Sequence, residues 1–136
     1  MRKTDFEAFI MEFPNVQREE NFGYSFFFVG DDHRLPFVTI ADSDNDNDDV
    51  SNLNREDVFR FNIGVSKETF NNLIAGLLKE GIDYSVLNVF LPHPHYSRQY
   101  FVCILNPVGE NAEKTKQLIV EAHLIAEGRL QRKGGS

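Results

Sequence analysis

Cysteine, tryptophan and long apolar runs are scarce or missing in this chain. Its one cysteine, Cys103, excludes an intramolecular disulfide, and there is no tryptophan. No apolar stretch approaches the roughly 20 residues of a membrane-spanning helix, and no secretory signal pattern opens the chain. We therefore expect a cytoplasmic protein that does not associate with membranes.

Basic residues are also scarce. The chain has 14 Lys and Arg against 21 Asp and Glu, a net charge of −7. Seven acids lie between Asp42 and Asp57 with Arg55 as the one base, so this segment holds −6 of the charge. Binding to duplex nucleic acid needs clustered Lys and Arg, and the sequence shows no such cluster. Nucleic acid is therefore a disfavoured partner.

The chain contains enough apolar residues to form one hydrophobic core. It has 136 residues, of which 41% are hydrophobic and 13 are phenylalanine. These values are typical of one globular domain. We predict a single domain over residues 1–133, and a flexible tail over the Gly-Gly-Ser sequence of residues 134–136.

Apolar periodicity predicts an α+β fold. An i, i+3, i+4 pattern is clearest after Ser66, and strict alternation is clearest at residues 58–63. The predicted helices span residues 5–13, 67–80 and 111–131, and the predicted strands span residues 16–20, 24–29, 37–40, 58–63 and 100–105. Residues 82–98 fit neither pattern well. This order predicts an antiparallel sheet of about four to five strands, with helices packed mainly on one face.

Four blocks of the sequence resemble a known bacterial family. They are residues 35–40 (LPFVTI), 58–66 (VFRFNIGVS), 91–96 (LPHPHY) and 101–107 (FVCILNP). In this order they resemble the family called domain of unknown function 6194, from about Tyr24 onward. That family brings no established activity, substrate or catalytic residue.

The order of the elements is also similar to the YjbR/MmcQ-like α+β fold. This resemblance rests on element order alone. Members of that group have been suggested to bind DNA on structural grounds. The acidic balance of this chain departs from that expectation, so the resemblance implies a fold and not a DNA-binding role.

The most chemically suggestive stretch is Pro92-His93-Pro94-His95-Tyr96. Two histidines two residues apart in an extended chain project to the same side, which suits a transition metal or a proton shuttle. No further ligand lies at a recognisable zinc spacing. Structural histidines in a proline-stiffened loop are the favoured interpretation, and His93 and His95 are the candidates if a metal binds.

Arg60 and Asn62 point to the sheet face opposite Phe59 and Phe61. If the His93 loop crosses that face, Arg60, Asn62, His93, His95 and Tyr96 would line one polar pocket. A free arginine there suits a carboxylate or phosphate on a small ligand. The alternative is that Arg60 pairs with an acid such as Asp49 or Asp57 and fixes the position of the acidic loop that contains residues 42–49.

The acidic run over residues 42–49 invites a calcium hypothesis. It fails the EF-hand pattern, because Asn47 stands where glycine is needed and Leu53 where glutamate is needed. We expect a solvated surface loop. Cys103 alternates with Phe101 and Leu105 in a strand and is expected to pack as a small hydrophobe.

Three functional hypotheses follow. The lead is a small cytosolic, non-enzymatic binding or interaction domain without a cofactor, with its pocket near Arg60, Asn62 and His93. Its partner would be a small anionic ligand or a protein, a second copy of the chain included. The alternative is a small metal-dependent or anion-binding enzyme that uses His93 and His95. The weakest is a nucleic-acid-associated protein by fold analogy alone.

Overall fold

The strands of this α+β protein pair into one antiparallel sheet. The computed structural model describes residues 2–74, 77 and 81–134. The elements in chain order are α1 (Lys3–Met11), β1 (Val16–Asn21), β2 (Tyr24–Val29), β3 (Val38–Ala41), β4 (Arg60–Gly64), α2 (Lys67–Ile74), β5 (Leu91–Pro92), the 3₁₀ turn η1 (Ser97–Gln99), β6 (Phe101–Leu105) and α3 (Gly109–Gly134). Within these ranges, no helix is both long and apolar enough to cross a membrane.

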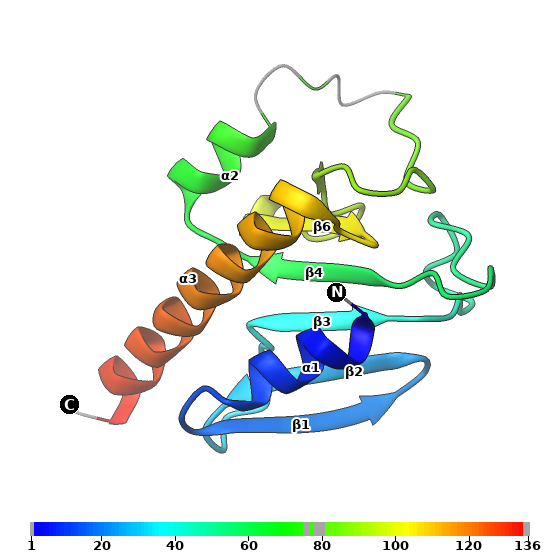
Figure 1. Cartoon of the computed structure of the whole chain (residues 1–136). Coiled ribbons are helices and arrows are strands. Elements are labelled where there is room, and N and C mark those ends of the chain that lie inside the picture. The colour runs from blue at the N-terminus through cyan, green and yellow to red at the C-terminus, as the bar shows by residue number, and fades with distance from the viewer. Residues whose placement is uncertain (1, 75–76, 78–80, 135–136) are drawn as a thin grey trace.

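The sheet has six strands in the order β1-β2-β3-β4-β6-β5 (Figure 1). This is more than the four to five strands predicted. The additional strand is β5, a two-residue strand that pairs Leu91 with Cys103. Two residues are too few to show the alternation by which strands are recognised in a sequence.

The register divides the side chains between two faces. Phe26, Thr39, Asn62 and Cys103 are cross-strand neighbours in that order and lie on one face, which we call the pocket face. The residues next to them in each strand lie on the opposite face, which we call the core face. The pocket face carries polar side chains at its centre, whereas the centre of the core face, over β3, β4 and β6, is apolar.

The core face is covered by α1 and α3, which lie on the same side of the sheet in Figure 1. Phe6 and Ile10 of α1 and Leu118 and Ile119 of α3 are almost fully buried against the apolar strand residues. Phe6 meets Phe61 edge to face, with their ring centroids 4.7 Å apart. Burying several large aromatic side chains in one cluster gives this small domain its core.

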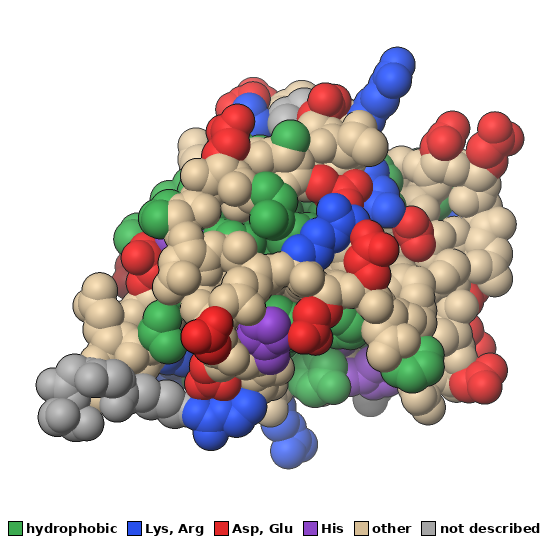
Figure 2. Space-filling model, turned by 90° about the horizontal axis from the view of Figure 1, so that it is seen from below, with side chains coloured by type: hydrophobic (Ala, Val, Ile, Leu, Met, Phe, Trp, Pro, Cys, Tyr) green, Lys and Arg blue, Asp and Glu red, His purple; other side chains and the backbone are tan. Residues whose placement is uncertain are grey.

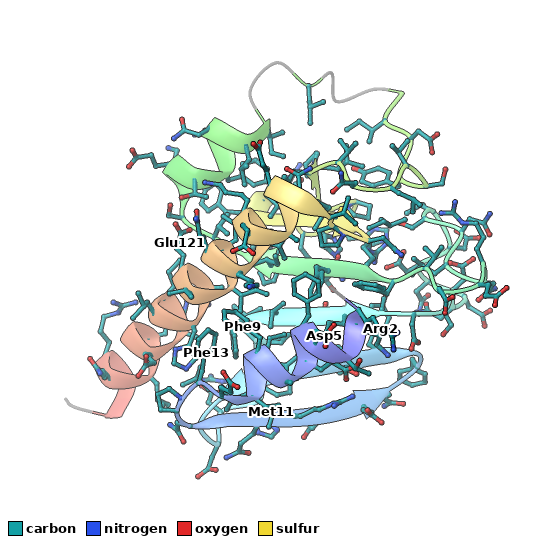
Figure 3. The ribbon with its side chains drawn as sticks, viewed as in Figure 1. Arg2, Asp5, Phe9, Met11, Phe13 and Glu121 are labelled. Atoms are coloured by element: carbon teal, nitrogen blue, oxygen red, sulfur yellow. The ribbon has the colours of Figure 1, made fainter. Side chains whose placement is uncertain are left out.

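Aromatic contacts link α1, and the turn that follows it, to α3. Phe9 in the C-terminal half of α1 and Phe13, two residues after the end of that helix, are labelled in Figure 3. Lys116 of α3 lies 5.8 Å from the centre of the Phe9 ring, and His123 of α3 lies 4.9 Å from the centre of Phe13. The first and last helices are therefore packed against each other as well as on the sheet.

Helix α2 is tied to α3 by Glu121, labelled in Figure 3. Its carboxylate accepts hydrogen bonds from the Ser66 backbone amide (2.9 Å) and the Thr69 hydroxyl (2.8 Å). A carboxylate at a helix N-terminus satisfies free backbone amides and complements the helix dipole. The predicted end of this helix, over residues 75–80, falls largely outside the described residues, and the prediction that the helices pack mainly on one face stays a prediction for α2.

The other helices differ from their predicted bounds at the ends. Helix α1 begins and ends two residues earlier than predicted, at Lys3 and Met11. Its start is fixed by the Asp5 carboxylate, which accepts from the Arg2 amide at 2.8 Å. Helix α3 extends past Gly128 and includes Gly134, which was predicted to belong to the tail. Residues 135–136 of that predicted tail lie outside the described residues.

Candidate ligand-binding site

The centre of the pocket face is built on a buried arginine. Arg60 of β4 is fully buried, and each of its three guanidinium nitrogens donates a hydrogen bond. Nε donates to Asn62 Oδ1 at 3.0 Å, Nη1 to Asp48 Oδ1 at 3.1 Å and to Ser51 Oγ at 2.9 Å, and Nη2 to Asp48 Oδ2. The two-pronged contact with Asp48 is the strongest geometry for an arginine–carboxylate pair.

Asp48 comes from the acidic loop and also accepts from the Tyr24 hydroxyl. Burial alone would raise the pKa of Asp48, but the hydrogen bonds from Arg60 and Tyr24 outweigh burial and hold the pKa below 3.8. Burial and the hydrogen bond to Asp48 raise the pKa of Tyr24 to about 12. Tyr24 therefore stays protonated and Asp48 ionised, which makes this a neutral, internally balanced group.

The network continues from Arg60 to the middle of the face. Asn62, 2% exposed, uses its oxygen for Arg60 and donates from Nδ2 to Thr39 Oγ1 at 2.8 Å. One amide proton of Asn62 and the hydroxyl proton of Thr39 are then left to donate elsewhere. These are uncharged donors held in place by buried partners.

His93 is buried and fixed in one tautomer. Its Nδ1 accepts from the backbone amides of His95 (3.0 Å) and Tyr96 (3.1 Å). Since both partners are donors, Nδ1 carries no proton, and the neutral ring carries it on Nε2. Burial, reinforced by the nearby Arg60 charge, lowers the pKa of His93 to about 3, so the ring is neutral at physiological pH.

The tautomer bears on the metal hypothesis. The ring centroids of His93 and His95 lie 6.0 Å apart. A metal at Nε2 of His93 would require the proton to move to Nδ1, which would break both hydrogen bonds that Nδ1 accepts. Among the described residues, no group of three or more His, Cys, Asp or Glu side chains is placed to hold a metal ion.

Phe101 reaches the site because Gly64 lies beside it in the sheet. A Cβ atom at Gly64 would lie 2.9 Å from Phe101 Cζ, closer than real Cβ contacts. Without that atom the ring of Phe101 lies across Gly64, where it makes edge contacts with His93 and Tyr96 at 6.4 Å. The absence of a side chain at Gly64 thus allows the Phe101 ring to lie next to the polar side chains of Asn62 and His93.

These parts surround a cavity of about 690 Å³. This volume is typical of small-molecule sites. Its lining is aromatic and apolar at the walls (Phe22, Tyr24, Phe26, Leu35, Pro36, Tyr96, Phe101), polar on the floor and rim (Thr39, Asn45, Asn47, Asn62, His93, His95, Gln99), and acidic or basic at Arg34, Asp46 and Asp48.

The structure brings together four of the five residues predicted for the site. Asn62, His93, His95 and Tyr96 line the cavity, and the His93 loop does cross the pocket face. Arg60 lies beneath it as a support, and its acid partner is Asp48, not Asp49 or Asp57. Cys103 is buried as expected, and burial raises the pKa of its thiol to about 12.

Sequence reasoning missed the β2 wall and Asp48. The rings of Tyr24 and Phe26 stack with their centroids 5.5 Å apart, and Phe26 continues the stack to Phe28 at 6.4 Å. Strand alternation could have placed these rings on one face. Nothing in an Asp-rich run distinguishes Asp48 from its neighbours, so no sequence signal marks it.

The acidic loop is ordered by its own hydrogen bonds. Asp44 accepts from the Leu53 amide at 2.8 Å, and the backbones of Asn45 and Asp48 bond to each other in both directions at 3.1 Å. The loop therefore presents one acid, Asp48, inward, while Asp46 and Asp49 are exposed. On the face seen in Figure 2, Lys and Arg side chains are scattered among Asp and Glu.

Comparisons with known proteins give a family and a fold. The model of a family of unknown function (DUF6194) matches residues 1–135. No curated protein matches the chain. A crystal structure of a Pseudomonas syringae protein from a structural genomics consortium is similar at a TM-score of 0.62 and 14% identity, covering 93% of this chain and 99% of that one. At this identity the likeness shows the fold alone, and the YjbR/MmcQ resemblance stays a prediction.

Proposed function

We propose that this chain, which belongs to the family of unknown function DUF6194, is a non-enzymatic binding domain for a small molecule held in the cavity of the pocket face. The observation that carries the proposal is a cavity of about 690 Å³ with an aromatic wall and a floor of fixed, uncharged donors. Ligand sites commonly combine apolar walls with a few convergent polar groups.

Preorganisation supports binding over a purely structural role. The floor donors Thr39, Asn62 and His93 are 6%, 2% and 5% exposed, and buried partners hold Asn62 and His93. Binding of a ligand would cost the protein little conformational entropy, because these side chains are already ordered.

The same geometry gives less support to the enzymatic alternative. A general base needs a free lone pair and a pKa near the working pH. The Nδ1 lone pair of His93 is already shared by two backbone amides, and its pKa is about 3. His93 is therefore better suited to donate a hydrogen bond from Nε2 than to shuttle protons.

A blocking variant tests the proposal. Gln99 lines the cavity and is exposed, whereas its neighbour Arg98 is exposed and does not line it. Gln99→Trp should narrow the cavity without disturbing the core, and Arg98→Trp is the matched control. The probes are neutral, acidic and basic aromatic fragments, screened by ligand-observed NMR.

We expect fragments that bind the unmodified chain to bind Arg98→Trp equally well and to lose binding to Gln99→Trp. An absence of hits would contradict the proposal. Hits that bind both variants alike would also contradict it, because they would bind elsewhere on the molecule.

A further inference from the structure

The turn between β1 and β2 carries an aromatic residue in an unfavourable conformation. Asn21 pairs with Tyr24, so Phe22 and Gly23 form a two-residue loop, and both have positive φ, +54° and +78°. Positive φ at both positions is typical of a type I′ turn, for which Asn-Gly is strongly preferred. A bulky aromatic residue at positive φ is strained.

Phe22 gains little burial that could offset this strain. The Phe22 side chain is 74% exposed, the highest value among the exposed large hydrophobic residues. No other described aromatic ring stacks against it, in contrast to Tyr24 and Phe26 directly along the strand. Yet Phe22 lines the cavity. Strained backbone positions of this kind cluster at active sites and ligand-binding sites.

The charges around the cavity indicate what the ligand carries. Both arginines near it are already paired: Arg60 with buried Asp48, and Arg34 with Asp32 through Nε and Nη2, both at 2.9 Å. The remaining acid, Asp46, stands exposed in the lining. An anionic ligand would have to compete with Asp32 for Arg34 and would lie near the exposed carboxylate of Asp46, so the pocket disfavours negative charge.

The floor of the cavity presents hydrogen-bond donors and therefore suits a ligand with a hydrogen-bond acceptor. Thr39 can donate its hydroxyl proton, Asn62 its second amide proton and His93 the proton on Nε2. Among the described residues nothing accepts from the His93 Nε2 proton, and that nitrogen is not sealed from solvent. Three uncharged donors without a facing acceptor suit a carbonyl oxygen or an aromatic ring nitrogen.

We propose, on the premise that the cavity binds a small molecule, that its ligand is a flat, uncharged ring compound bearing a hydrogen-bond acceptor. The acceptor lies on the floor of Thr39, Asn62 and His93, and the ring lies against the aromatic wall of β2. Phe22 closes over the ring at the mouth and is the residue that selects for a flat aromatic body. The strain at Phe22 is retained because the ligand needs this ring.

Phe22→Asn separates a ligand role from a structural one. The substitution installs the Asn-Gly pair that the turn prefers, so it should raise the melting temperature by roughly 2–6 °C for a chain of this size. It also removes the ring at the mouth. Phe22→Tyr is the matched control, because it keeps both the ring and the strain.

The probes are three compounds of one shape and different charge: 2-naphthamide, 2-naphthoate and 2-naphthylmethylammonium. We expect the neutral amide to bind the unmodified chain about tenfold more tightly than either charged compound, measured by calorimetry. Phe22→Asn should weaken the amide about tenfold while raising the melting temperature, and Phe22→Tyr should bind it with unchanged affinity.

Two results would overturn the ligand class. One is equal or tighter binding of the naphthoate or the ammonium compound, and the other is full affinity for the amide in Phe22→Asn. If none of the three binds, the class is wrong, and the fragment screen then decides the premise. If fragments bind the unmodified chain and no longer bind Gln99→Trp, the proposed binding function is supported and only the ligand class is wrong. If the screen finds no such fragments, both proposals are wrong.

Discussion

At the scale of single residues, the site depends on one buried ion pair. Arg60 and Asp48 neutralise each other, and Tyr24, Ser51 and Asn62 satisfy their remaining groups. Such a pair is costly to bury, and replacing both partners by apolar residues is often neutral for stability. Its value here lies in holding Asn62 in the orientation that the cavity floor needs.

Removing one partner of this pair should be severe. Arg60→Leu leaves the Asp48 carboxylate buried without a countercharge, and we expect a loss of about 3–5 kcal/mol in the free energy of unfolding. Arg34→Met is the control, because the Arg34 side chain is 71% exposed and its ion pair should contribute at most about 1 kcal/mol. Urea denaturation measures both.

The double variant Asp48→Leu with Arg60→Met should regain most of the stability lost in Arg60→Leu. If Arg60→Leu lowers the free energy of unfolding by no more than Arg34→Met does, the Arg60–Asp48 pair does not stabilise the site.

His93 gives a prediction on pH. The pKa of His93 is about 3 in the folded chain, against 6.5 for an ordinary histidine. Between pH 3 and pH 6.5, His93 is therefore protonated in the unfolded chain and neutral in the folded chain. This residue therefore contributes to stability above about pH 6.5, and its contribution is lost as the pH falls toward 3. In histidine NMR spectra, we expect the His93 ring signals to stay constant from pH 8 to 5.

The same chain in concentrated urea is the control for this titration. There His93 should titrate with a midpoint near 6.5. An inflection near that pH in the folded chain would mean that the ring is neither buried nor held in the neutral form.

At the scale of elements, long periodic patterns could be predicted from the sequence and short or irregular ones could not. The alternation at Phe59, Phe61 and Ile63 predicted a strand over residues 58–63, which overlaps β4 (Arg60–Gly64), and gave the face of Asn62. Strand β5 and the His93 turn have no period, because their shape comes from pairing with β6 and from hydrogen bonds to the His93 ring. The cavity floor was therefore partly predictable, and of its walls only Tyr96 was predicted.

Gly64 offers a prediction at this scale. Gly64→Ala places a methyl group 2.9 Å from the Phe101 ring, and the ring must move. Overpacking of this kind costs about 1–3 kcal/mol. Because Phe101 contacts His93 and Tyr96, we also expect the amide signals of residues 93–96 to shift, which a heteronuclear NMR spectrum measures.

Gly128→Ala is the matched control for this substitution. In α3 the nearest atom to the new methyl group would be Arg132 Nη1 at 3.5 Å, an ordinary contact. Replacing a helical glycine there should stabilise the fold by about 0.5–1 kcal/mol. Equal effects of the two substitutions would contradict the role given to Gly64.

At the scale of the whole molecule, the fold separates its two faces. Helices α1 and α3 bury the apolar core face, and the connections between strands, the acidic loop and the His93 loop, rise around the polar pocket face. Loops that surround a rigid sheet are where binding residues commonly lie. The sequence predicted the α+β fold correctly, but no local signal indicates that these two loops line one cavity.

The central claim is that the pocket face binds a small molecule, and chemical-shift mapping tests it most directly. The isotope-labelled chain is titrated with the strongest fragment hit, and the Asn62 side-chain amide gives its own signal at the cavity floor. We predict the largest changes at that amide and at the backbone amides of residues 45–48 and 93–99, with small changes in α1 and α3. Largest changes on the two helices, or none at Asn62, would contradict the account.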